Sequence, residues 1–314
     1  MSSASEEPFR NASVPLVTPG DLRVILRTRD GVPVEARYEP CVKGPGDTAI
    51  VVAHGFTGSV DRPAVRRAAG VFAQRAAVVT FSFRGHGRSG GRSTVGDKEV
   101  LDLAAAVEWA HSLGHSRVVT VGFSMGGSVV LRHAALHGDG VGGAGGAGVD
   151  GGAGGAAGTG SAGSRSAGSR SAASRSAASR SGGSVQAVAA VSSPARWYYR
   201  GTAPMRRLHW VVTRPLGRLV GRFGLRTRIH TEEWDPVPLS PVDAVPMIAP
   251  APLLIVHGDR DPYFPLDHPR MLAAAAGAGA AELWVEPGMG HAENAAGDEL
   301  LGRVGEWLMR PEGA

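Results

Sequence analysis

The stretch VVTVGFSMGGSVVL, residues 118–131, decides the fold and raises the first question about function. Strand-like residues lead into a cluster of small residues, and a second apolar run typical of a helix follows. The cluster consists of Gly122, Ser124, Gly126 and Gly127. Glycine has no Cβ, so it lets backbones approach closely in a tight, strained turn. The stretch therefore predicts a strand, a sharp turn carrying Ser124, and a helix, the arrangement that exposes a nucleophilic serine.

The same pattern, G-x-S-x-G, also occurs in GRSGG at residues 87–91. Ser89 lies several residues beyond its strand, and no helix is expected before about Gly96, so we predict a loop there. A nucleophilic turn needs a helix directly after the serine, because the helix N-terminus supplies free N–H groups and a positive dipole. Of the two serines, Ser124 meets this condition, and we predict Ser124 as the nucleophile.

The composition is that of a chain with a sizeable hydrophobic core. The chain has 314 residues, 43% of them hydrophobic, enough for one large α/β domain or two modest ones. Cys41 is the single cysteine, which excludes an intramolecular disulfide and a cysteine-based metal site and suits a reducing cytoplasm. The N-terminal residues have no apolar signal-peptide core, and no apolar run approaches the roughly 18 residues of a membrane span. We therefore expect a soluble, cytoplasmic protein.

Residues 138–184 differ from the rest of the chain, because they consist almost entirely of Gly, Ala, Ser and Arg. They include a pentapeptide repeated four times, SAGSR SAGSR SAASR SAASR, at residues 161–180. Such a segment buries too little apolar surface to offset the entropy of ordering. We therefore predict a flexible insert within a single domain that spans 1–314. A nucleic-acid tether is the alternative, but without aromatic residues to stack on bases we expect no nucleic-acid partner.

Outside this insert, strand and helix patterns alternate along the chain. Short apolar runs predict strands, first in a hairpin over 21–40 and then at 48–55, 76–83, 117–123, 185–193, 251–258 and 281–287. Apolar residues at helical spacing predict helices at 61–74, 97–113 and 125–136. The alternation predicts an α/β fold, a mostly parallel sheet of about eight strands with helices on both faces. In such a sheet the chemistry gathers at the carboxyl ends of the strands.

A serine nucleophile needs a base, and the base needs an acid that orients it. One predicted strand ends in DRDPYFP, which offers Asp259 and Asp261, and the last predicted strand leads into GMGHAEN, which offers His291. Both segments follow strands at the edge where Ser124 is expected. The order serine, acid, histidine is the one typical of this strand–turn–helix architecture. We therefore predict His291 as the base and one of the two aspartates as the acid.

Five motifs occur in order along the chain. They are HGFTGS (54–59), FRGHGRSGG (83–91), GFSMGG (122–127), HGDRDPYFP (257–265) and GMGHAEN (288–294). Together they resemble the α/β-hydrolase superfamily, in particular the branch of bacterial esterases, monoglyceride-lipase-like enzymes and serine aminopeptidase-like proteins. The resemblance covers essentially the whole chain apart from the insert and an arginine-rich segment.

The resemblance also implies the remaining site residues. The family pattern H-G-x-x-D for the catalytic acid ends on Asp261, which favours Asp261 and leaves Asp259 as the alternative. The family's oxyanion hole uses two backbone N–H groups, which here belong to Phe56 and Met125. The resemblance implies neither a metal nor an organic cofactor.

Residues 196–250 occupy the position at which the family inserts a small cap over its active site. The part at 196–230 holds nine arginines and no carboxylate. Four arginines recur at every fourth position and on a helix would form one face: Arg214, Arg218, Arg222 and Arg226. We expect an exposed basic face on a lid, and as the alternative a surface that attracts an anionic membrane or an anionic acyl substrate. Aromatic residues of this region are expected to line an apolar pocket or to pack the cap down: Trp197, Tyr198, Tyr199, Trp210 and Trp234.

These residues predict a serine hydrolase that cleaves carboxylic esters of small molecules through an acyl-enzyme intermediate. One alternative keeps the fold and changes the bond, to that of a peptide or a thioester. Another alternative is a non-catalytic, hydrolase-like protein that binds membranes or anions through its basic cap.

Overall fold

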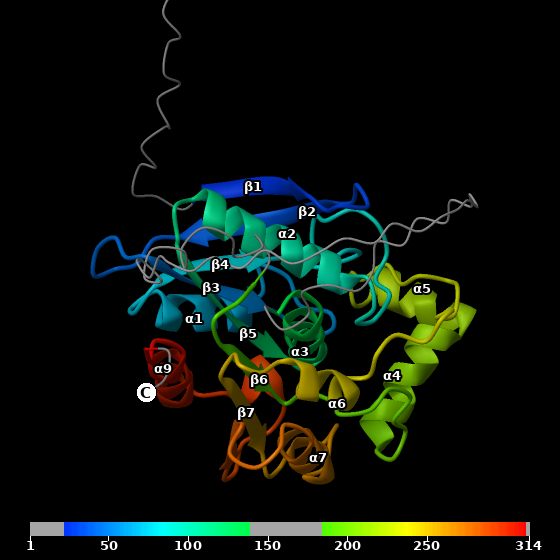
Figure 1. Cartoon of the computed structure of the whole chain (residues 1–314). Helices are drawn as coiled ribbons and strands as arrows, with labels where there is room; N and C mark the ends of the chain where they lie inside the picture. The colour runs from blue at the N-terminus through cyan, green and yellow to red at the C-terminus, as the bar shows by residue number, and fades with distance from the viewer. Residues whose placement is uncertain (1–21, 139–183, 312–314) are drawn as a thin grey trace, which may run out of the picture.

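The computed structural model describes residues 22–138 and 184–311 (Figure 1). The predicted flexible insert therefore lies outside the described residues, except for its two end residues. Within the described ranges, eight strands form one sheet, which confirms the predicted α/β class. The strands are β1 (Leu22–Arg27), β2 (Pro33–Glu39), β3 (Thr48–Ala53), β4 (Ala77–Phe81), β5 (Arg117–Phe123), β6 (Val188–Val191), β7 (Leu253–Gly258) and β8 (Ala281–Glu286).

The strands follow the order β1-β2-β4-β3-β5-β6-β7-β8 across the sheet. The hairpin of β1 and β2 is antiparallel, as is the pair of β2 and β4, and the other neighbours in this sheet are parallel. Every residue of β3 is buried, because this central strand has helices on both faces. At the end of β5, Gly122 pairs with Ala53 on one side and Ala190 on the other. Ser124 therefore follows at the middle of the carboxyl edge.

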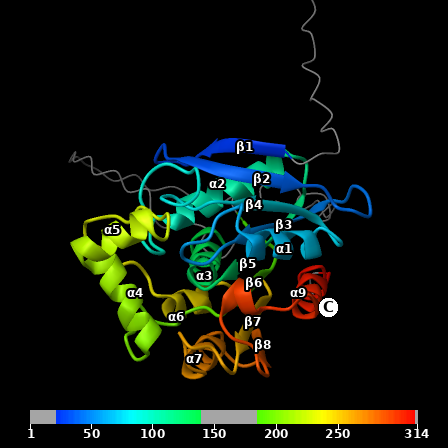
Figure 2. The same cartoon turned by 180° about the vertical axis from the view of Figure 1, so that it is seen from behind.

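Helices cover both faces of the sheet, as Figures 1 and 2 show from opposite sides. On one face, α1 (Pro63–Phe72) packs beside α9 (Asp298–Leu308). The other face is covered by α2 (Glu99–Ser112), α3 (Met125–His137) and α7 (Asp267–Ala275). The predicted cover on both faces is thus confirmed.

Each face of the sheet has its own apolar core. Phe72 of α1 and Leu301 of α9 are buried on one face, and Leu103 of α2 and Leu131 of α3 are buried on the other. Fully burying a side chain of this size stabilises the fold by about 1.5–3 kcal/mol. The loops at the carboxyl edge therefore project from strands that are fixed from both sides.

Helix α3 begins at the carboxyl end of β5 and returns the chain toward the amino-terminal edge of the sheet, where β6 starts. It has 13 residues, which at about 1.5 Å per residue carry the chain about 20 Å. At the amino-terminal edge the next strand begins, and the N–H of Gln186 donates to the carbonyl of Val118 at 2.9 Å. The two described ends of the insert, Gly138 and Ser184, therefore lie at the edge away from Ser124.

Between β6 and β7 the chain forms two helices that project from one side of the molecule (Figure 1). They are α4 (Ala203–Thr213) and α5 (Pro215–Phe223). The short helix α6 (Pro241–Ala244) and the 3-10 helix η1 (Val245–Met247) follow and return the chain to the sheet. The segment 196–250 thus contains four helices joined by irregular stretches, and its role as a lid stays a prediction.

The single helical face expected for four arginines is wrong. Arg214 has an extended conformation between α4 and α5, with φ −97° and ψ 142°. Arg226 lies beyond α5 and has a φ of 55°. Pro215 explains the break, because a residue before proline is kept out of the helical region. Of the four arginines, Arg218 and Arg222 lie within α5.

None of the helices in the described ranges is both long and apolar enough to span a bilayer. The longest of them, α2, has 14 residues, whereas a span needs about 20 apolar residues. The single-domain organisation and the cytoplasmic location expected from the sequence stay predictions.

Candidate active site

Ser124 lies on a one-residue turn between β5 and α3. Its φ of 52° and ψ of −114° are strained for a residue with a side chain, at about 1–3 kcal/mol. Two glycines allow the close approach that this turn requires. A Cβ on Gly122 would lie 2.2 Å from the carbonyl oxygen of Gly126, and a Cβ on Gly126 would lie 2.2 Å from that of Ala53. The structure therefore places Ser124 on the predicted strand–turn–helix.

The second serine of the repeated pattern, Ser89, has a purely structural environment. Its side chain is fully buried. Its Oγ accepts a hydrogen bond from the N–H of Glu35 at 2.9 Å and donates one to the carbonyl of Ser82. Ser89 thus ties the loop after β4 to β2, and its hydroxyl is already engaged on both sides.

Ser124, His291 and Asp261 form a continuous hydrogen-bonded row. Ser124 Oγ lies 2.8 Å from His291 Nε2, and His291 Nδ1 lies 2.7 Å from Asp261 Oδ2. The three residues follow β5, β8 and β7, and His291 directly precedes the short helix α8 (Ala292–Ala295). They meet because the carboxyl ends of parallel strands share one edge of the sheet. In such a row an imidazole can take a proton from a serine hydroxyl.

The surroundings of Asp261 favour the ionised form of its carboxyl group. Burial alone would raise its pKa, but hydrogen bonds from His291 and from the backbone hold the pKa below its ordinary value. Its Oδ1 accepts from the N–H groups of Tyr263 and Phe264 at 2.8 and 3.1 Å. Asp259, the alternative acid, is exposed and accepts a hydrogen bond from a loop N–H at 2.6 Å. Of the two aspartates, Asp261 is the one that contacts the imidazole.

The orientation of the His291 ring follows from its partners. Because an ionised Asp261 accepts the hydrogen bond from Nδ1, the proton of the neutral ring lies on Nδ1 and Nε2 is free to accept from Ser124. The ring of Tyr263 packs against the imidazole with centroids 4.3 Å apart and planes tilted by 31°. Hydrogen bonding and packing therefore hold the ring in one orientation.

The backbone N–H groups of Phe56 and Met125 are the predicted oxyanion donors. Both residues line the same cavity as Ser124. Met125 is the first residue of α3, so its N–H has no partner inside the helix. Within the described residues, neither N–H donates a hydrogen bond. Two free donors near a nucleophile are what an oxyanion hole requires.

The loop that carries Phe56 is fixed by His54. His54 Nε2 accepts from the N–H of Phe83 at 3.0 Å, so the ring proton lies on Nδ1 and is donated to the carbonyl of Gly55 at 2.7 Å. Burial and the neighbouring His86 lower the pKa of His54 to about 3. The ring therefore stays neutral at neutral pH and braces the loop.

Glu293 is a site residue that sequence reasoning missed. Its carboxylate is buried, and Oε1 accepts a hydrogen bond from the N–H of Gly55 at 3.1 Å. Burial raises the pKa of this carboxyl group. Glu293 connects the segment after His291 to the loop that carries Phe56. The sequence signal is only an acid two positions after the predicted base, His291, which does not distinguish Glu293 from an exposed glutamate.

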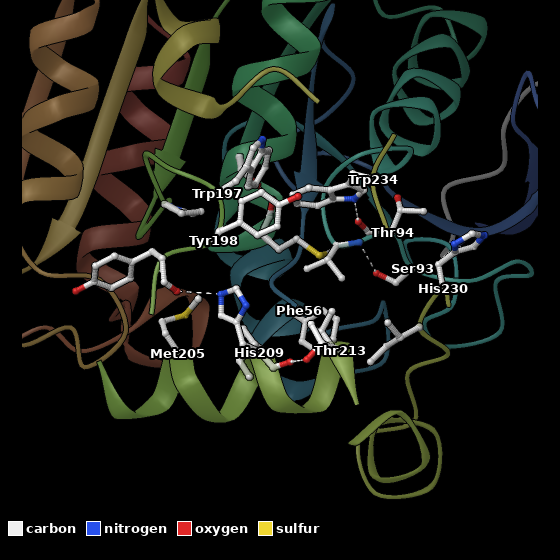
Figure 3. Close-up of a pocket in the computed structure, with 18 of the residues that line it drawn as sticks. Phe56, Ser93, Thr94, Trp197, Tyr198, Met205, His209, Thr213, His230 and Trp234 are labelled. Atoms are coloured by element: carbon white, nitrogen blue, oxygen red, sulfur yellow. Dashed lines mark hydrogen bonds between the residues drawn. The ribbon is translucent and has the colours of Figure 1, made fainter. Parts of the chain in front are cut away.

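A cavity of about 350 Å³ opens at Ser124. One wall is α4, from which Met205, His209 and Thr213 project toward the cavity (Figure 3). These residues are four positions apart and therefore share one face of the helix. The segment between β6 and β7 thus supplies one wall of the cavity. Ser124, at the carboxyl edge of the sheet, lines the same cavity.

Aromatic side chains give this cavity an apolar lining (Figure 3). Trp197 and Trp234 contact each other with ring centroids 5.1 Å apart, and each indole N–H donates to a backbone carbonyl, at 2.9 and 2.8 Å. Because these N–H groups are engaged within the protein, the ring faces offer an apolar surface. Four of the five aromatic residues named from the sequence line the cavity, namely Trp197, Tyr198, Tyr199 and Trp234. Trp210 is exposed instead.

The chemistry that the site offers is that of a hydroxyl, an imidazole, a carboxylate and two backbone N–H groups. Across the described ranges, no group of three or more His, Cys, Asp or Glu side chains could hold a metal ion.

The similarity to solved structures extends over nearly the whole chain. The esterase Pf2001 from Pyrococcus furiosus has 22% identity and a TM-score of 0.62, with 98% of this chain and 100% of that chain covered. The esterase domain of a Rhodothermus marinus protein has 19% identity and a TM-score of 0.55, with coverage of 92% and 96%. An alpha-beta serine hydrolase homologue from Coxiella burnetii has 17% identity and a TM-score of 0.54, with coverage of 95% and 99%. At these identities the similarity establishes the fold.

The family is established by the sequence itself. A search of curated proteins finds no match. A sequence model described as "Alpha/beta hydrolase family" matches residues 50–302. This match runs from β3 to α9 and includes the elements that carry Ser124, Asp261 and His291. The chain therefore belongs to the α/β hydrolase family.

Proposed function

We propose that this protein is a serine hydrolase that cleaves carboxylic esters of small molecules through an acyl-enzyme intermediate. The observation that carries the proposal is the hydrogen-bonded row of Ser124, His291 and Asp261, with separations of 2.8 and 2.7 Å, at the mouth of an apolar cavity. A non-catalytic binding protein has no need for a strained serine aligned on an oriented imidazole.

In the first half-reaction, Ser124 Oγ attacks the ester carbonyl while His291 Nε2 takes the hydroxyl proton. The carbonyl π electrons move to the oxygen, and the N–H groups of Phe56 and Met125 stabilise the resulting oxyanion. One such donor is worth about 3–4 kcal/mol of transition-state stabilisation. When the tetrahedral intermediate collapses, the C–O bond to the alcohol breaks, and His291 gives its proton to the departing oxygen. Asp261 stabilises the imidazolium that exists between these two transfers.

In the second half-reaction, water replaces the alcohol. His291 Nε2 takes a proton from water, the hydroxide oxygen attacks the acyl carbonyl, and the same two N–H groups hold the oxyanion. The bond from the acyl carbon to Ser124 Oγ then breaks, and Oγ recovers its proton from His291. The products are a carboxylic acid and a free serine, so one water is consumed for each ester cleaved.

The cavity favours an apolar acyl or alcohol group next to the reacting carbonyl. Its aromatic walls have their N–H groups bonded within the protein. His209 Nε2–H also donates to the carbonyl of Tyr199 at 3.0 Å. Burial lowers the pKa of this histidine, so the ring stays neutral. A substrate that needed many hydrogen bonds from these walls would leave its own polar groups unpaired.

Labelling with a fluorophosphonate probe tests the nucleophile. We expect the wild-type protein to be labelled and Ser124→Ala to remain unlabelled, whereas Ser89→Ala should be labelled like the wild type. Absence of labelling in folded wild-type protein, or labelling that persists in Ser124→Ala, would contradict the proposal.

A panel of matched acyl esters, thioesters and amides tests the bond. We expect the largest kcat/KM for esters, with a preference for apolar acyl groups. Faster turnover of an amide or a thioester than of its matched ester would replace the proposed esterase with a peptidase or a thioesterase on the same site.

A further inference from the structure

Helix α5 carries an apolar stripe that faces away from the protein. Its four large apolar side chains are exposed to unusual degrees, Leu216 by 69%, Leu219 by 53%, Val220 by 48% and Phe223 by 71%. Their spacing of three and four residues places them on one face of the helix. A surface helix of a soluble domain normally turns such a stripe inward. Here the stripe has no described residue covering it.

Two glycines explain why the stripe faces outward. Gly217 and Gly221 are the buried residues of α5. A Cβ on Gly217 would lie 2.2 Å from the carbonyl oxygen of Trp210, so α5 rests with its backbone directly against α4. Rotating the apolar stripe toward α4 would place large side chains where only a glycine fits. The outward orientation is therefore fixed by the helix contact and does not result from a loose helix.

The segment that carries the stripe, residues 196–230, is strongly cationic. Between residues 206 and 226, five arginines are exposed and form no ion pair with a described residue: Arg206, Arg207, Arg214, Arg222 and Arg226. The guanidinium of Arg222 lies 5.5 Å from the ring centroid of Phe223, at the border of the stripe. Because residues 196–230 contain no carboxylate, nothing in this segment offsets the charge.

We propose that the outward face of α5 docks on an anionic lipid bilayer, with Leu216, Leu219, Val220 and Phe223 inserted at the boundary of headgroups and acyl chains. An apolar stripe with Arg222 at its border, on a segment that holds nine arginines and no carboxylate, matches the surface of such a bilayer in both polarity and charge. A second copy of this chain matches it poorly, because a two-fold dimer would bring the same cationic segment of both copies together. Charge complementarity therefore selects the lipid surface.

Docking in this way brings the cavity close to the bilayer. Helix α4 lies against α5 on one side and lines the cavity with Met205, His209 and Thr213 on the other. An ester taken from the lipid phase is then the substrate class that fits, a step that rests on the proposed function. The docking itself does not depend on catalysis.

Sedimentation with lipid vesicles tests the docking. The full chain is mixed with vesicles of phosphatidylcholine alone, or of phosphatidylcholine and phosphatidylglycerol in a ratio of about 7:3. We expect binding to the anionic vesicles that weakens as salt is raised. The variant Leu219→Glu/Phe223→Glu should bind at least about tenfold more weakly. The control Ile25→Glu replaces an equally exposed apolar residue on β1, 57% exposed, and should bind like the wild type.

Three results would overturn the inference. They are undiminished binding by the double variant, equal binding to neutral and anionic vesicles, and self-association through α5 without vesicle binding, seen by analytical ultracentrifugation. A second variant, Arg206→Gln/Arg207→Gln/Arg222→Gln, should lose the preference for anionic vesicles while keeping its fold.

Catalysis is measured separately with a water-soluble ester, which all these variants should cleave at the wild-type rate. Vesicle binding by a wild-type protein that cleaves no ester would refute the proposed function and leave the docking intact. Ester cleavage without vesicle binding would refute the docking alone.

Discussion

Glu293 and Gly55 are 238 residues apart in the sequence, yet the buried carboxylate of one accepts a hydrogen bond from the N–H of the other at 3.1 Å. The bond links the segment after His291 to the loop that carries the Phe56 N–H. A residue that does not line the cavity thus connects the segment after the predicted base to the loop that carries a predicted oxyanion donor. We regard Glu293 as a positioning residue.

Glu293→Ala is expected to lower kcat on a soluble ester by about tenfold or more, with a smaller effect on KM. The buried N–H of Gly55 would lose its partner, at a cost of about 1–3 kcal/mol, and the loop would shift relative to the reacting carbonyl. Glu293→Gln keeps an acceptor oxygen and should retain most of the activity. Steady-state kinetics on both variants test this prediction. An equal loss of kcat in both variants would mean that the charge of Glu293, and not its hydrogen bond to Gly55, supports catalysis.

The same residue predicts a pH dependence of stability. Burial raises the folded-state pKa of Glu293 above 4.5, so the folded protein binds more protons than the unfolded chain in this range. The contribution of Glu293 to stability is therefore full below about pH 4.5 and is lost as the pH rises through the folded-state pKa. The side chain of Glu293→Gln does not titrate. The free energy of unfolding of this variant minus that of the wild type should therefore increase with pH, as measured by denaturant titration. A difference that does not depend on pH would contradict this prediction.

Asp261→Asn should lower kcat by about 10⁴-fold, because an amide no longer fixes the imidazole with its proton on Nδ1. Asp259→Asn is the matched control, since Asp259 is exposed and does not contact His291. It should keep kcat within about twofold of the wild type. Thermal melts of both variants exclude unfolding as the cause, and a larger defect in Asp259→Asn would reverse the assignment of the acid.

Two glycine substitutions should have opposite effects. In Gly126→Ala the new Cβ would lie 2.2 Å from a backbone carbonyl, so the turn must open, at a cost of about 1–3 kcal/mol or more, and activity should be lost. In Gly70→Ala, on α1, nothing lies within 4 Å of the new Cβ, and the better helix former should stabilise by up to about 1 kcal/mol. Melting temperatures and ester turnover of the two proteins test the pair. A fully active Gly126→Ala would show that the turn can relax.

Because the ring of His133 is buried, we expect the free energy of unfolding to fall in acid. The ring is fully buried, neither nitrogen has a described partner, and burial, with His137 nearby, lowers its pKa to about 3. The folded-state pKa is thus below the unfolded value of 6.5, so the stability that the neutral ring contributes is present above pH 6.5 and falls as the pH drops toward 3. At about 1.4 kcal/mol per pH unit, the loss near pH 5 is about 2 kcal/mol. His133→Leu should remove this loss, and identical acid sensitivity of the two proteins would exclude His133 as its source.

The fold could be predicted from the sequence where the local pattern of apolar and small residues matches the position of the segment in the sheet. The strand at 48–55 reads as buried on both faces because it lies at the centre of the sheet. Gly122 and Ser124 were predictable because the close approach they make requires small residues and a helix directly behind them. The positions of Asp261 and His291 followed from strand ends, since parallel strands bring their loops to one edge.

The segment between β6 and β7 was predictable only in part. Spacing alone suggested one arginine face, whereas Pro215 separates α4 from α5 and rotates the second helix out of register with the first. The outward orientation of Phe223 depends on which side of α5 contacts α4, and that choice is made by Gly217 against Trp210. Contacts of this kind come from tertiary packing and leave no periodic signal.

The direction of α3 has a consequence for how this chain can change in length. Gly138 lies at the far end of that helix, about 20 Å from the serine by the rise of its 13 residues. Ser184 lies two residues before Gln186, which is bonded to Val118 at the start of β5. Repeats could therefore be added or deleted between these two positions over evolutionary time while the reacting groups kept their places. A change in chain length between Gly138 and Ser184 and the preservation of the groups at Ser124 are, in this architecture, separate matters.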